Sequence, residues 1–328
     1  MKVQLRSIVA MAALGLTIQA TAMAAAPSAS AQPWPTRPVR FIVSLGAGSG
    51  VDIAARLIAD RLSARWAQPV LVENRPGGDA IMAINAVIGA HDDHILLYTP
   101  TSSLTAHPYQ HAKMPYDPQA LTPLARVTTT VLGFVISPTL KVHTLADFIA
   151  LIRAQPGELN YSTGTGMTDV LYDAFFKREN LQIARVGYRD VISPMTDLAE
   201  GRIHAYIAGL PVTLPHVQAG RAKLVAVTNT ARAASHPDVP TVAEAGFPAL
   251  TFDGLVGVYG PSDIQAQTRE RIAADLRAVL SEPEIVARLN RMGAVVTPGG
   301  GADFAASLVD QRDKLAEAAK LLGISAGK

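Results

Sequence analysis

Three glycines at alternate positions, Gly46, Gly48 and Gly50, follow an apolar run from Phe41 to Leu45. The run is typical of a buried strand, and a helical apolar pattern begins at Val51. A loop between a strand and a helix start offers free backbone N–H groups and the positive end of a helix dipole. The spacing therefore predicts an anion-binding loop, with a tight turn that binds nothing as the alternative.

Two nucleotide-binding patterns and one catalytic pattern fail at this loop. A dinucleotide fingerprint requires a third glycine where Val51 stands, although Glu73 lies about where a ribose-binding acid belongs. A Walker-type loop requires Gly-Lys-Ser/Thr, which does not follow. A nucleophile elbow around Ser49 requires glycines where Ala47 and Val51 stand. A nucleotide site and a serine hydrolase are both disfavoured.

A second loop of the same kind, Thr163 to Thr168, leads into another predicted helix. Two such loops facing each other across a cleft could hold the ends of a small anion with N–H groups and hydroxyls. Neither loop contains Lys or Arg. A small carboxylate fits this equipment better than a polyphosphate.

Two histidine clusters resemble metal ligands in their composition. The segment His91 to His94 contains two aspartates, but its position between a helix and a strand favours a solvated turn. His107 and His111 would share one face of a helix, but Pro108 argues against a helix there. We therefore expect no metal and no cofactor.

The N-terminal segment has the layout of a secretory signal peptide. Lys2 and Arg6 precede an apolar stretch, residues 8–20, and small residues then allow cleavage after Ala24 or Ala31. The stretch is short for a membrane span, which needs about 20 apolar residues. We expect residues 1–31 to direct export, with an uncleaved amphipathic helix as the alternative.

Charge and cysteine content restrict the possible partners. The chain has 29 basic and 27 acidic residues, and without Lys2 and Arg6 the two numbers are equal. No basic tract remains to suggest nucleic acid or an anionic membrane. The chain has no cysteine, so an exported form would depend on its cores, which 49% hydrophobic residues can supply.

Apolar runs alternate with helical patterns along most of the chain, which predicts an α/β protein with mostly parallel sheets flanked by helices. In the first part we expect strands at 39–45, 69–75, 94–99 and 127–137, helices at 51–66 and 81–90, and a polar loop at 99–105. In the second part we expect strands at 159–162, 183–188, 203–209 and 223–229. Helices are expected there at 144–158, 170–179 and 191–201, the first with Thr144 as N-cap and Asp147 in the capping-box position. The chain then returns through 252–261 to amphipathic helices at 264–281 and 302–323.

This order predicts two lobes. The first lobe is discontinuous and consists of residues 34–136 together with 251–328, and the second consists of residues 137–250. Two crossings between the lobes would leave a cleft, where ligands commonly bind.

Several segments together resemble the Bug family, the periplasmic solute receptors of tripartite tricarboxylate transporters. The most characteristic pair is "VENRPG" at 72–77 and "DVPTVAEAG" at 238–246, and the likeness covers essentially the whole chain. The resemblance implies a monomeric, periplasmic, two-lobe Venus-flytrap protein without catalytic activity. Such receptors clamp a small carboxylate between loops of both lobes and present the closed form to a membrane permease.

The resemblance also implies ligand contacts by position. In the first lobe these are Leu45, Gly46, Ala47, Gly48, Ser49, Gly50, Asp52, Thr99, Thr101, Ser102 and Ser103. In the second lobe they are Thr163, Gly164, Thr165, Gly166, Thr168, Tyr188, Arg189 and, within the stretch Ala208 to Leu210, Gly209. Asp52 could equally serve as a helix-start residue.

The chain departs from the family pattern within these segments. Ser49 replaces a common glycine, Gly50 stands where proline is frequent, Asp190 follows Arg189, and Ala208 replaces a frequent aspartate. Loss of that carboxylate removes a partner for an amino group, which favours a mono- or dicarboxylate, aromatic acids included, over an amino acid. A sensor that presents its closed form to a membrane signalling partner and an exported hydrolase are the alternative functions.

Overall fold

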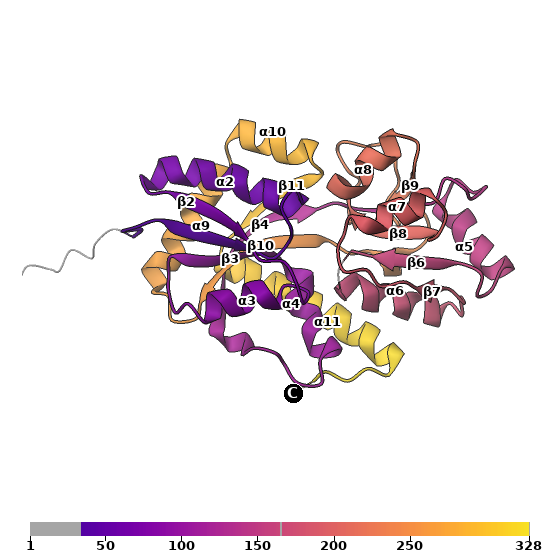
Figure 1. Cartoon of the computed structure of the whole chain (residues 1–328), viewed down its shortest axis with the longest axis horizontal. Coiled ribbons are helices and arrows are strands. Elements are labelled where there is room, and N and C mark those ends of the chain that lie inside the picture. Colours follow the sequence, from indigo (N-terminus) through magenta and orange to yellow (C-terminus); the bar gives the residue numbers. More distant parts are fainter. Residues whose placement is uncertain (1–33, 165, 328) are drawn as a thin grey trace, which may run out of the picture. The chain divides into compact units, whose positions relative to one another are not determined.

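The computed structural model describes residues 34–164 and 166–327, so the predicted signal peptide lies outside the described residues. Two β-sheets, each flanked by helices, organise the part of the chain from Arg37 onward (Figure 1). The first sheet has the strand order β11-β4-β10-β3-β1-β2 and the second has the order β7-β6-β8-β5-β9.

The first sheet consists of β1 (Val39–Val43), β2 (Val70–Asn74), β3 (Ile95–Pro100), β4 (Leu121–Thr130), β10 (Gly254–Pro261) and β11 (Ala294–Gly299). Its helices are α2 (Gly50–Trp66), α3 (Ile81–Ile88), α4 (Thr101–Gln110), α9 (Ala266–Leu280), α10 (Pro283–Arg291) and α11 (Gly301–Leu322). The second sheet consists of β5 (Leu132–Ile136), β6 (Asn160–Thr163), β7 (Ala184–Arg185), β8 (Ala205–Gly209) and β9 (Lys223–Val227). Its helices are α5 (Leu145–Ala154), α6 (Gly166–Arg178), α7 (Ser193–Ala199) and α8 (Leu210–Gln218), and the short 3₁₀ helices η1 (Pro118–Ala120) and η2 (Pro248–Leu250) complete the chain.

Both sheets, predicted to be mostly parallel, are mixed. The strands built by βαβ units pair in parallel, β1 with β2 and β3 in the first sheet and β6 with β7 and β8 in the second. The strands next to the crossings, β10 and β5, pair antiparallel with both of their neighbours. The mixture follows from topology, because a chain that enters and leaves a lobe through adjacent strands runs in opposite directions there.

The single strand predicted at 127–137 is wrong, because the chain changes sheets within it. β4 ends at Thr130 and β5 begins at Leu132 in the other sheet. Between them, the Val131 N–H donates to the Gly293 carbonyl, and the Val131 carbonyl accepts from the Leu210 N–H. The run of β-branched residues favours extended backbone on both sides of the crossing, so the change of partner leaves no trace in composition.

Asn229, which is 4% exposed, joins the two crossings. Its Oδ1 accepts from the Leu132 N–H at 2.9 Å. Its Nδ2 donates to the Thr130 carbonyl at 3.2 Å and to Asp253 Oδ1 at 2.9 Å. One buried amide therefore connects the outgoing strand pair to the returning chain.

Apolar cores pack the helices onto the sheets. Ile42, Ile84 and Phe304 belong to a cluster that packs α3 and α11 on the first sheet. Phe134 and Phe148 belong to the cluster that packs α5 and α6 on the second sheet. The predicted capping box of α5 is confirmed, since Thr144 and Asp147 exchange side-chain to backbone hydrogen bonds.

The polar loop expected at 99–105 is wrong, because α4 begins at Thr101. Thr105 Oγ1 donates to the Thr101 and Ser102 carbonyls, which satisfies its hydroxyl within the helix. Pro108 lies inside the last turn of α4, so the expectation that it excludes a helix there is also wrong. A proline near the end of a helix removes only one intrahelical hydrogen bond.

Helix α11 contacts elements that belong to both sheets. Phe304 near its start packs on the first sheet. Leu315 and Ala318 in its second half pack against Met167 and Val170 of α6, together with Ala106 of α4. None of the helices within the described residues combines the length and apolar content that a membrane crossing requires.

Candidate functional site

The glycine loop after β1 is shaped by the start of α2. Ser49 is the N-cap, and its Oγ accepts from the Asp52 N–H at 3.2 Å. Gly48 has φ of 83°, a conformation that favours glycine, and its N–H donates to Asp52 Oδ2 at 2.9 Å. The loop is therefore folded onto the first turn of the helix.

Asp52 holds this loop from the inside. Its Oδ1 accepts from Arg56 Nε at 3.0 Å and from Asn74 Nδ2 at 2.9 Å, and Asn74 also donates to the Leu45 carbonyl. Burial alone would raise the pKa of Asp52, but the hydrogen bonds from Arg56, Gly48 and Asn74 outweigh burial and lower it. The contacts that Asp52 makes are those of a helix-start residue that braces the loop.

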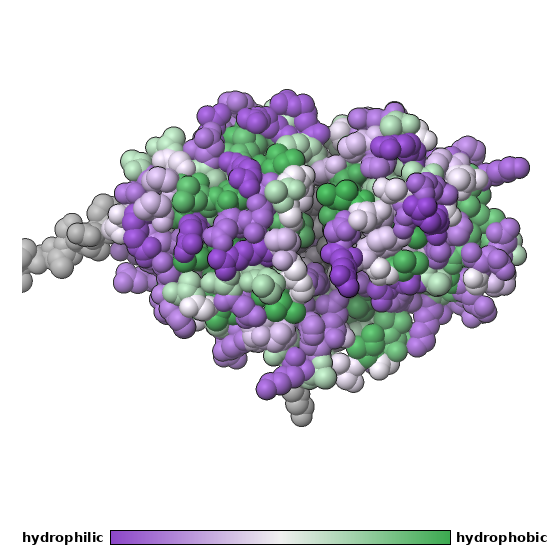
Figure 2. All heavy atoms as spheres, in the orientation of Figure 1, coloured by the Kyte–Doolittle hydropathy of each residue, from purple (hydrophilic) through white to green (hydrophobic). Residues whose placement is uncertain are grey.

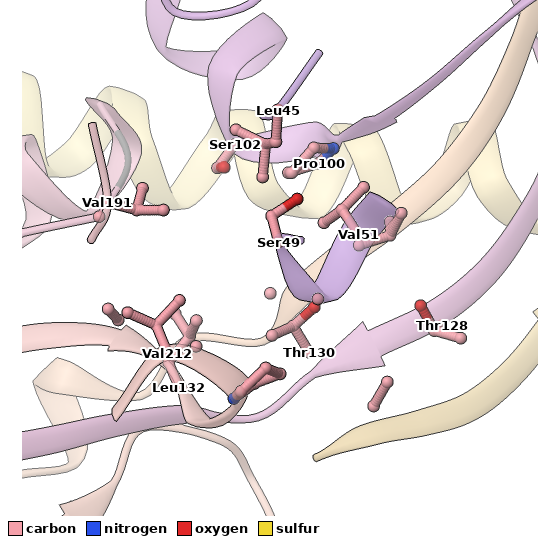
Figure 3. A pocket seen from close by; sticks show the side chains of 18 of the residues that line it. Leu45, Ser49, Val51, Pro100, Ser102, Thr128, Thr130, Leu132, Val191 and Val212 are labelled. Atoms are coloured by element: carbon pink, nitrogen blue, oxygen red, sulfur yellow. The ribbon is translucent and has the colours of Figure 1, made fainter. Parts of the chain in front are cut away.

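A pocket of about 810 Å³, counted out to its open mouth, lies beside this loop between elements of the two sheets (Figure 3). On the face shown in Figure 2, the surface is hollowed between the elements of the first sheet and those of the second sheet.

Three groups of residues form the wall. Elements of the first sheet contribute Leu45, Ser49, Gly50, Val51, Ala54, Pro100 and Ser102. Elements of the second sheet contribute Gly164, Thr168, Val191, Ile207, Ala208, Gly209, Pro211 and Val212. The crossing strands and the start of β11 contribute Thr128, Thr130, Leu132, Phe252, Gly254, Val256 and Ala294.

Four helices begin at this wall. Gly50 starts α2, Pro100 and Ser102 flank the start of α4, Thr168 is in the first turn of α6, and Pro211 is in the first turn of α8. The N-caps of α4 and α8, Pro100 and Gly209, supply no side-chain hydrogen bond, but at α8 the Leu210 N–H donates to the Val131 carbonyl and Pro211 has no N–H. N–H groups in the first turn of a helix have no intrahelical partner and carry the positive end of the dipole, so the pocket is suited to an anion.

Seven of the residues that the family resemblance implies as ligand contacts lie in this wall. They are Leu45, Ser49, Gly50, Ser102, Gly164, Thr168 and Gly209. The structure thus brings part of the glycine loop, the start of α4 and the loop before α6 to one cavity.

Four of the first-lobe residues that the family resemblance implies as ligand contacts lie behind the wall. Their side chains have partners within the protein. Thr99 Oγ1 lies 2.6 Å from Ser44 Oγ, Thr101 Oγ1 donates to Gln311 Oε1, and Ser103 Oγ donates to Asp79 Oδ1. Asp52 is the fourth. Gly46, Ala47 and Gly48 are exposed and are not among the residues that line the pocket.

The remaining implied residues of the second lobe also lie outside the wall. Thr163 Oγ1 donates to Asp169, Gly166 packs beside Asp79 and Gln110 of the first-lobe elements, and Tyr188 donates to Asp197 Oδ2. Arg189 is exposed. Thr165 lies outside the described residues.

The wall residues from the crossing strands were not predicted. Thr128, Thr130 and Leu132 fall in the segment interpreted as one strand, and Phe252 and Gly254 fall in the return segment. The prediction of two crossings beside a cleft was the available signal, because such strands necessarily pass the base of the cleft.

Asp169 lies next to the site on the first turn of α6. Burial raises its pKa to about 6, assisted by Asp173 and Asp79 and opposed by Thr163 and Arg185. Its carboxylate pairs with Arg185 at 3.0 Å. Asp169 therefore neutralises the positive charge of Arg185.

Side chains of both histidine clusters have hydrogen-bond partners within the protein. His107 Nε2 lies 2.8 Å from the Asp79 carbonyl, so this nitrogen must donate, and Nδ1 then accepts from the Tyr116 hydroxyl at 2.7 Å. Asp92, Asp93 and His94 place ligand atoms within 4.8 Å of one another. However, Arg37 donates two hydrogen bonds to Asp92, at 3.0 and 2.7 Å, in a turn of the predicted kind.

The chain matches a known family over most of its length. The family model described as the tripartite tricarboxylate transporter family receptor matches residues 54–323. A UPF0065 protein of Bordetella bronchiseptica is 31% identical over 290 residues, which cover 87% of this chain and 86% of that protein. Protein BugT of Bordetella pertussis is 28% identical over 309 residues, which cover 92% of this chain and 94% of BugT.

A solved structure supports the same assignment. The structure of R. palustris Rpa4515 with adipate has a TM-score of 0.81 and 27% identity to this chain, and it covers 89% of this chain and 99% of its own. This similarity confirms the predicted two-lobe fold, and the relatives confirm the resemblance to the Bug family. The chain belongs to the receptor family of the tripartite tricarboxylate transporters.

Proposed function

We propose that this receptor captures a small organic acid, a mono- or dicarboxylate, by lobe closure and delivers it to the membrane subunits of a tripartite tricarboxylate-type transporter. The observation that carries the proposal is the convergence of four helix starts on one pocket, of which α4 has no side-chain cap on its first-turn N–H groups. The presence of adipate with the similar protein Rpa4515 supports a carboxylate as the ligand.

The proposed site is the pocket wall together with the implied loop residues around it. Ser49 and Ser102 supply hydroxyl donors, and the first-turn N–H groups of α2 and α4 supply the rest of a carboxylate clamp. The polar equipment suits binding rather than bond cleavage, and we propose that the protein has no catalytic activity. The receptor family to which it belongs is consistent with that role.

Location and lobe boundaries complete the proposal. Family membership implies a periplasmic location. We propose that the signal peptide is cleaved after Ala24 or Ala31. We also propose the division into residues 34–136 with 251–328 and residues 137–250, with its first boundary moved to Val131, because β5 (Leu132–Ile136) belongs to the second sheet.

Closure around the ligand requires that the ligand contact the closed state better than the open one. The wall meets this requirement, because helix starts on both sides of the pocket contribute to it. A ligand held by one side alone would give no closing force.

A thermal-shift screen of the mature protein against small carboxylates tests the proposal. A ligand that binds only the folded state at 100 times its Kd raises the unfolding free energy by about 2.7 kcal/mol. We expect stabilisation by at least one acid, with NAD and ATP as controls that give none. Stabilisation by a nucleotide, with none by any acid in a broad panel, would contradict the proposal.

A further inference from the structure

Few of the described side chains that line the pocket are polar, and none of them carries a charge. Among the described residues of the wall, the polar side chains are hydroxyls only, those of Ser49, Ser102, Thr128, Thr130 and Thr168. No described wall residue is Asp, Glu, Lys, Arg or His. Any negative charge in the pocket must therefore be stabilised by helix starts and hydroxyl donors.

Both serine hydroxyls and the starts of α2 and α4 lie on the first-lobe side, whereas the starts of α6 and α8 lie on the second-lobe side. Ser49 is the N-cap of α2, Val51 belongs to its first turn, and Pro100 and Ser102 flank the start of α4. In the view of Figure 3, Ser102 and Pro100 lie on one side of Ser49, and Val212 and Leu132 lie on the other. One carboxylate finds donors between α2 and α4.

Among the described residues of the facing wall, the side chains are apolar apart from the Thr168 hydroxyl. The first two residues of α8 add no donor, because the Leu210 N–H donates to the Val131 carbonyl and Pro211 has no N–H. Val191, Ile207 and Val212 line this wall, together with Phe252 from the returning strand. A second carboxylate against these side chains would lose its water without gaining hydrogen bonds or a countercharge. The two threonines of the crossing strand, Thr128 and Thr130, can each donate one hydrogen bond, which satisfies a neutral polar group.

The two arginines behind the wall, Arg56 and Arg185, cannot supply the missing countercharge. Arg56 is hydrogen-bonded to Asp52 and Asn74. Arg185 is paired with Asp169 at 3.0 Å and with Asp173 at 3.1 Å. Both arginines are neutralised by neighbouring acids, and those acids repel a second carboxylate.

We infer that the pocket selects a monocarboxylate with an apolar body, aliphatic or aromatic, over a dicarboxylate of the same length. The inference rests on the proposed function and narrows its ligand class. The carboxylate lies between the starts of α2 and α4, and the apolar body lies against Val191, Ile207, Val212 and Phe252.

Calorimetric titration with matched pairs of acids tests the inference. Hexanoate is compared with adipate, and benzoate with terephthalate, at constant ionic strength and neutral pH. We expect the monoacid of at least one pair to bind at least about 10-fold more tightly than its diacid. Diacids that bind as tightly as or more tightly than both monoacids would overturn the inference and leave the receptor function intact, whereas binding of no carboxylate in the wider panel would overturn both.

A charge placed on the apolar wall provides a second test. Val212→Lys adds a cation on α8, and we expect it to shift the ratio of adipate to hexanoate affinity by about 10-fold or more toward adipate. Gln218→Lys adds the same charge on an exposed position of the same helix and should leave the ratio unchanged. Equal shifts in the two variants would overturn the assignment of the apolar wall.

Val191→Lys repeats the test from a loop, in case a lysine in the first turn of α8 prevents folding. Both variants are first compared with the parent protein by thermal denaturation. If a folded Val191→Lys protein keeps the parent preference, the apolar wall does not select the ligand.

Discussion

Ser49 uses one oxygen for two contacts. Its Oγ accepts from the Asp52 N–H and so caps α2, which leaves its O–H able to donate into the pocket. Ser102 also lines the pocket, but the α4 helix has Pro100 at its N-cap and does not use the Ser102 side chain as a cap. The two serines therefore separate the contribution of a hydroxyl to binding from its contribution to helix stability.

We predict that Ser102→Ala weakens carboxylate binding by about 10- to 100-fold, the equivalent of a hydrogen bond to a charged group of about 1.5–3 kcal/mol. Its thermal midpoint should change little. Ser49→Ala should weaken binding similarly and also lower the unfolding free energy by about 1 kcal/mol, because the cap is lost. Titration calorimetry and urea denaturation measure the two effects.

Ser281→Ala serves as the control, because Ser281 Oγ donates to the Arg277 carbonyl on an exposed helix end. Ser281→Ala should leave the carboxylate affinity unchanged. If Ser102→Ala binds carboxylates as the parent does, the anion does not lie between α2 and α4.

Asp169 should make stability depend on pH in a direction opposite to most carboxylates. Its pKa is raised from 3.8 to about 6 in the folded state, so folding takes up a proton between these values. The stability contributed by Asp169 is therefore complete below about pH 4 and is lost as pH rises through about 6. We predict that the unfolding free energy of the parent, relative to Asp169→Asn, falls by about 2–3 kcal/mol from pH 4 to pH 7.

Urea denaturation across this pH range measures the difference, and groups common to both proteins cancel. His107, whose pKa burial lowers, is one such group. Asp310→Asn, which removes an exposed carboxylate paired with Lys314, should follow the parent. A constant difference between the parent and Asp169→Asn would show that Asp169 is not protonated on folding.

At the level of elements, α2 and α8 touch at the mouth of the pocket. A Cβ atom on Gly50 would lie 2.7 Å from Pro211 Cγ, so glycine is required for this approach. The proline ring is rigid and cannot move aside as a flexible side chain could. The start of α2 and the start of α8 therefore fit together only because one of them has no side chain.

We predict that Gly50→Ala lowers carboxylate affinity by about 10-fold or more, because the added methyl group keeps α2 and α8 apart in the closed state. Gly46→Ala is the matched control, since its Cβ would meet nothing within 4 Å. The double change Gly50→Ala with Pro211→Ala should recover part of the affinity. Equal affinities of the two single variants, measured by calorimetry, would mean that this contact does not limit closure.

Elements with strong local signals were predicted well and those defined by distant partners were not. Helix α2 and the capping box of α5 are encoded by adjacent residues, including Thr144 and Asp147. The break between β4 and β5 depends on Gly293 and Leu210, which are remote in sequence. Helix α4 begins with hydroxyl residues and contains Pro108, so its local composition favours a loop although its packing makes it a helix.

The candidate site shows the same division. The glycine loop can be recognised in the sequence from Gly46, Gly48 and Gly50. In contrast, the wall residues Val191, Val212 and Phe252 are ordinary apolar residues in the sequence. Only the fold shows that these three side chains share a cavity. The apolar half of the ligand site could therefore not be predicted, and it is the half that bears on ligand class.

At the level of the whole receptor, the two crossings are held together by Asn229. We predict that Asn229→Ala lowers the unfolding free energy by about 1–3 kcal/mol, because it leaves the Leu132 N–H buried without its acceptor. The amide of Leu132 should also exchange with solvent deuterium faster than in the parent. Chemical denaturation and hydrogen exchange measure these effects.

Thr230→Ala is the control for this prediction, because Thr230 is exposed and adjacent and makes only a 3.3 Å contact with Asp253. It should change stability by less than about 0.5 kcal/mol. Unchanged protection of the Leu132 amide in Asn229→Ala would show that another group satisfies it.

Helix α11 adds a third attachment to the two crossing strands, because Leu315 and Ala318 in its second half pack against α6. We expect this attachment to restrict closure to a movement that carries α7 and α8 toward α2, while the starts of α4 and α6 keep their alignment. We expect an arriving carboxylate to meet a half-assembled site in the open receptor, so that first encounter and final enclosure depend on different helices.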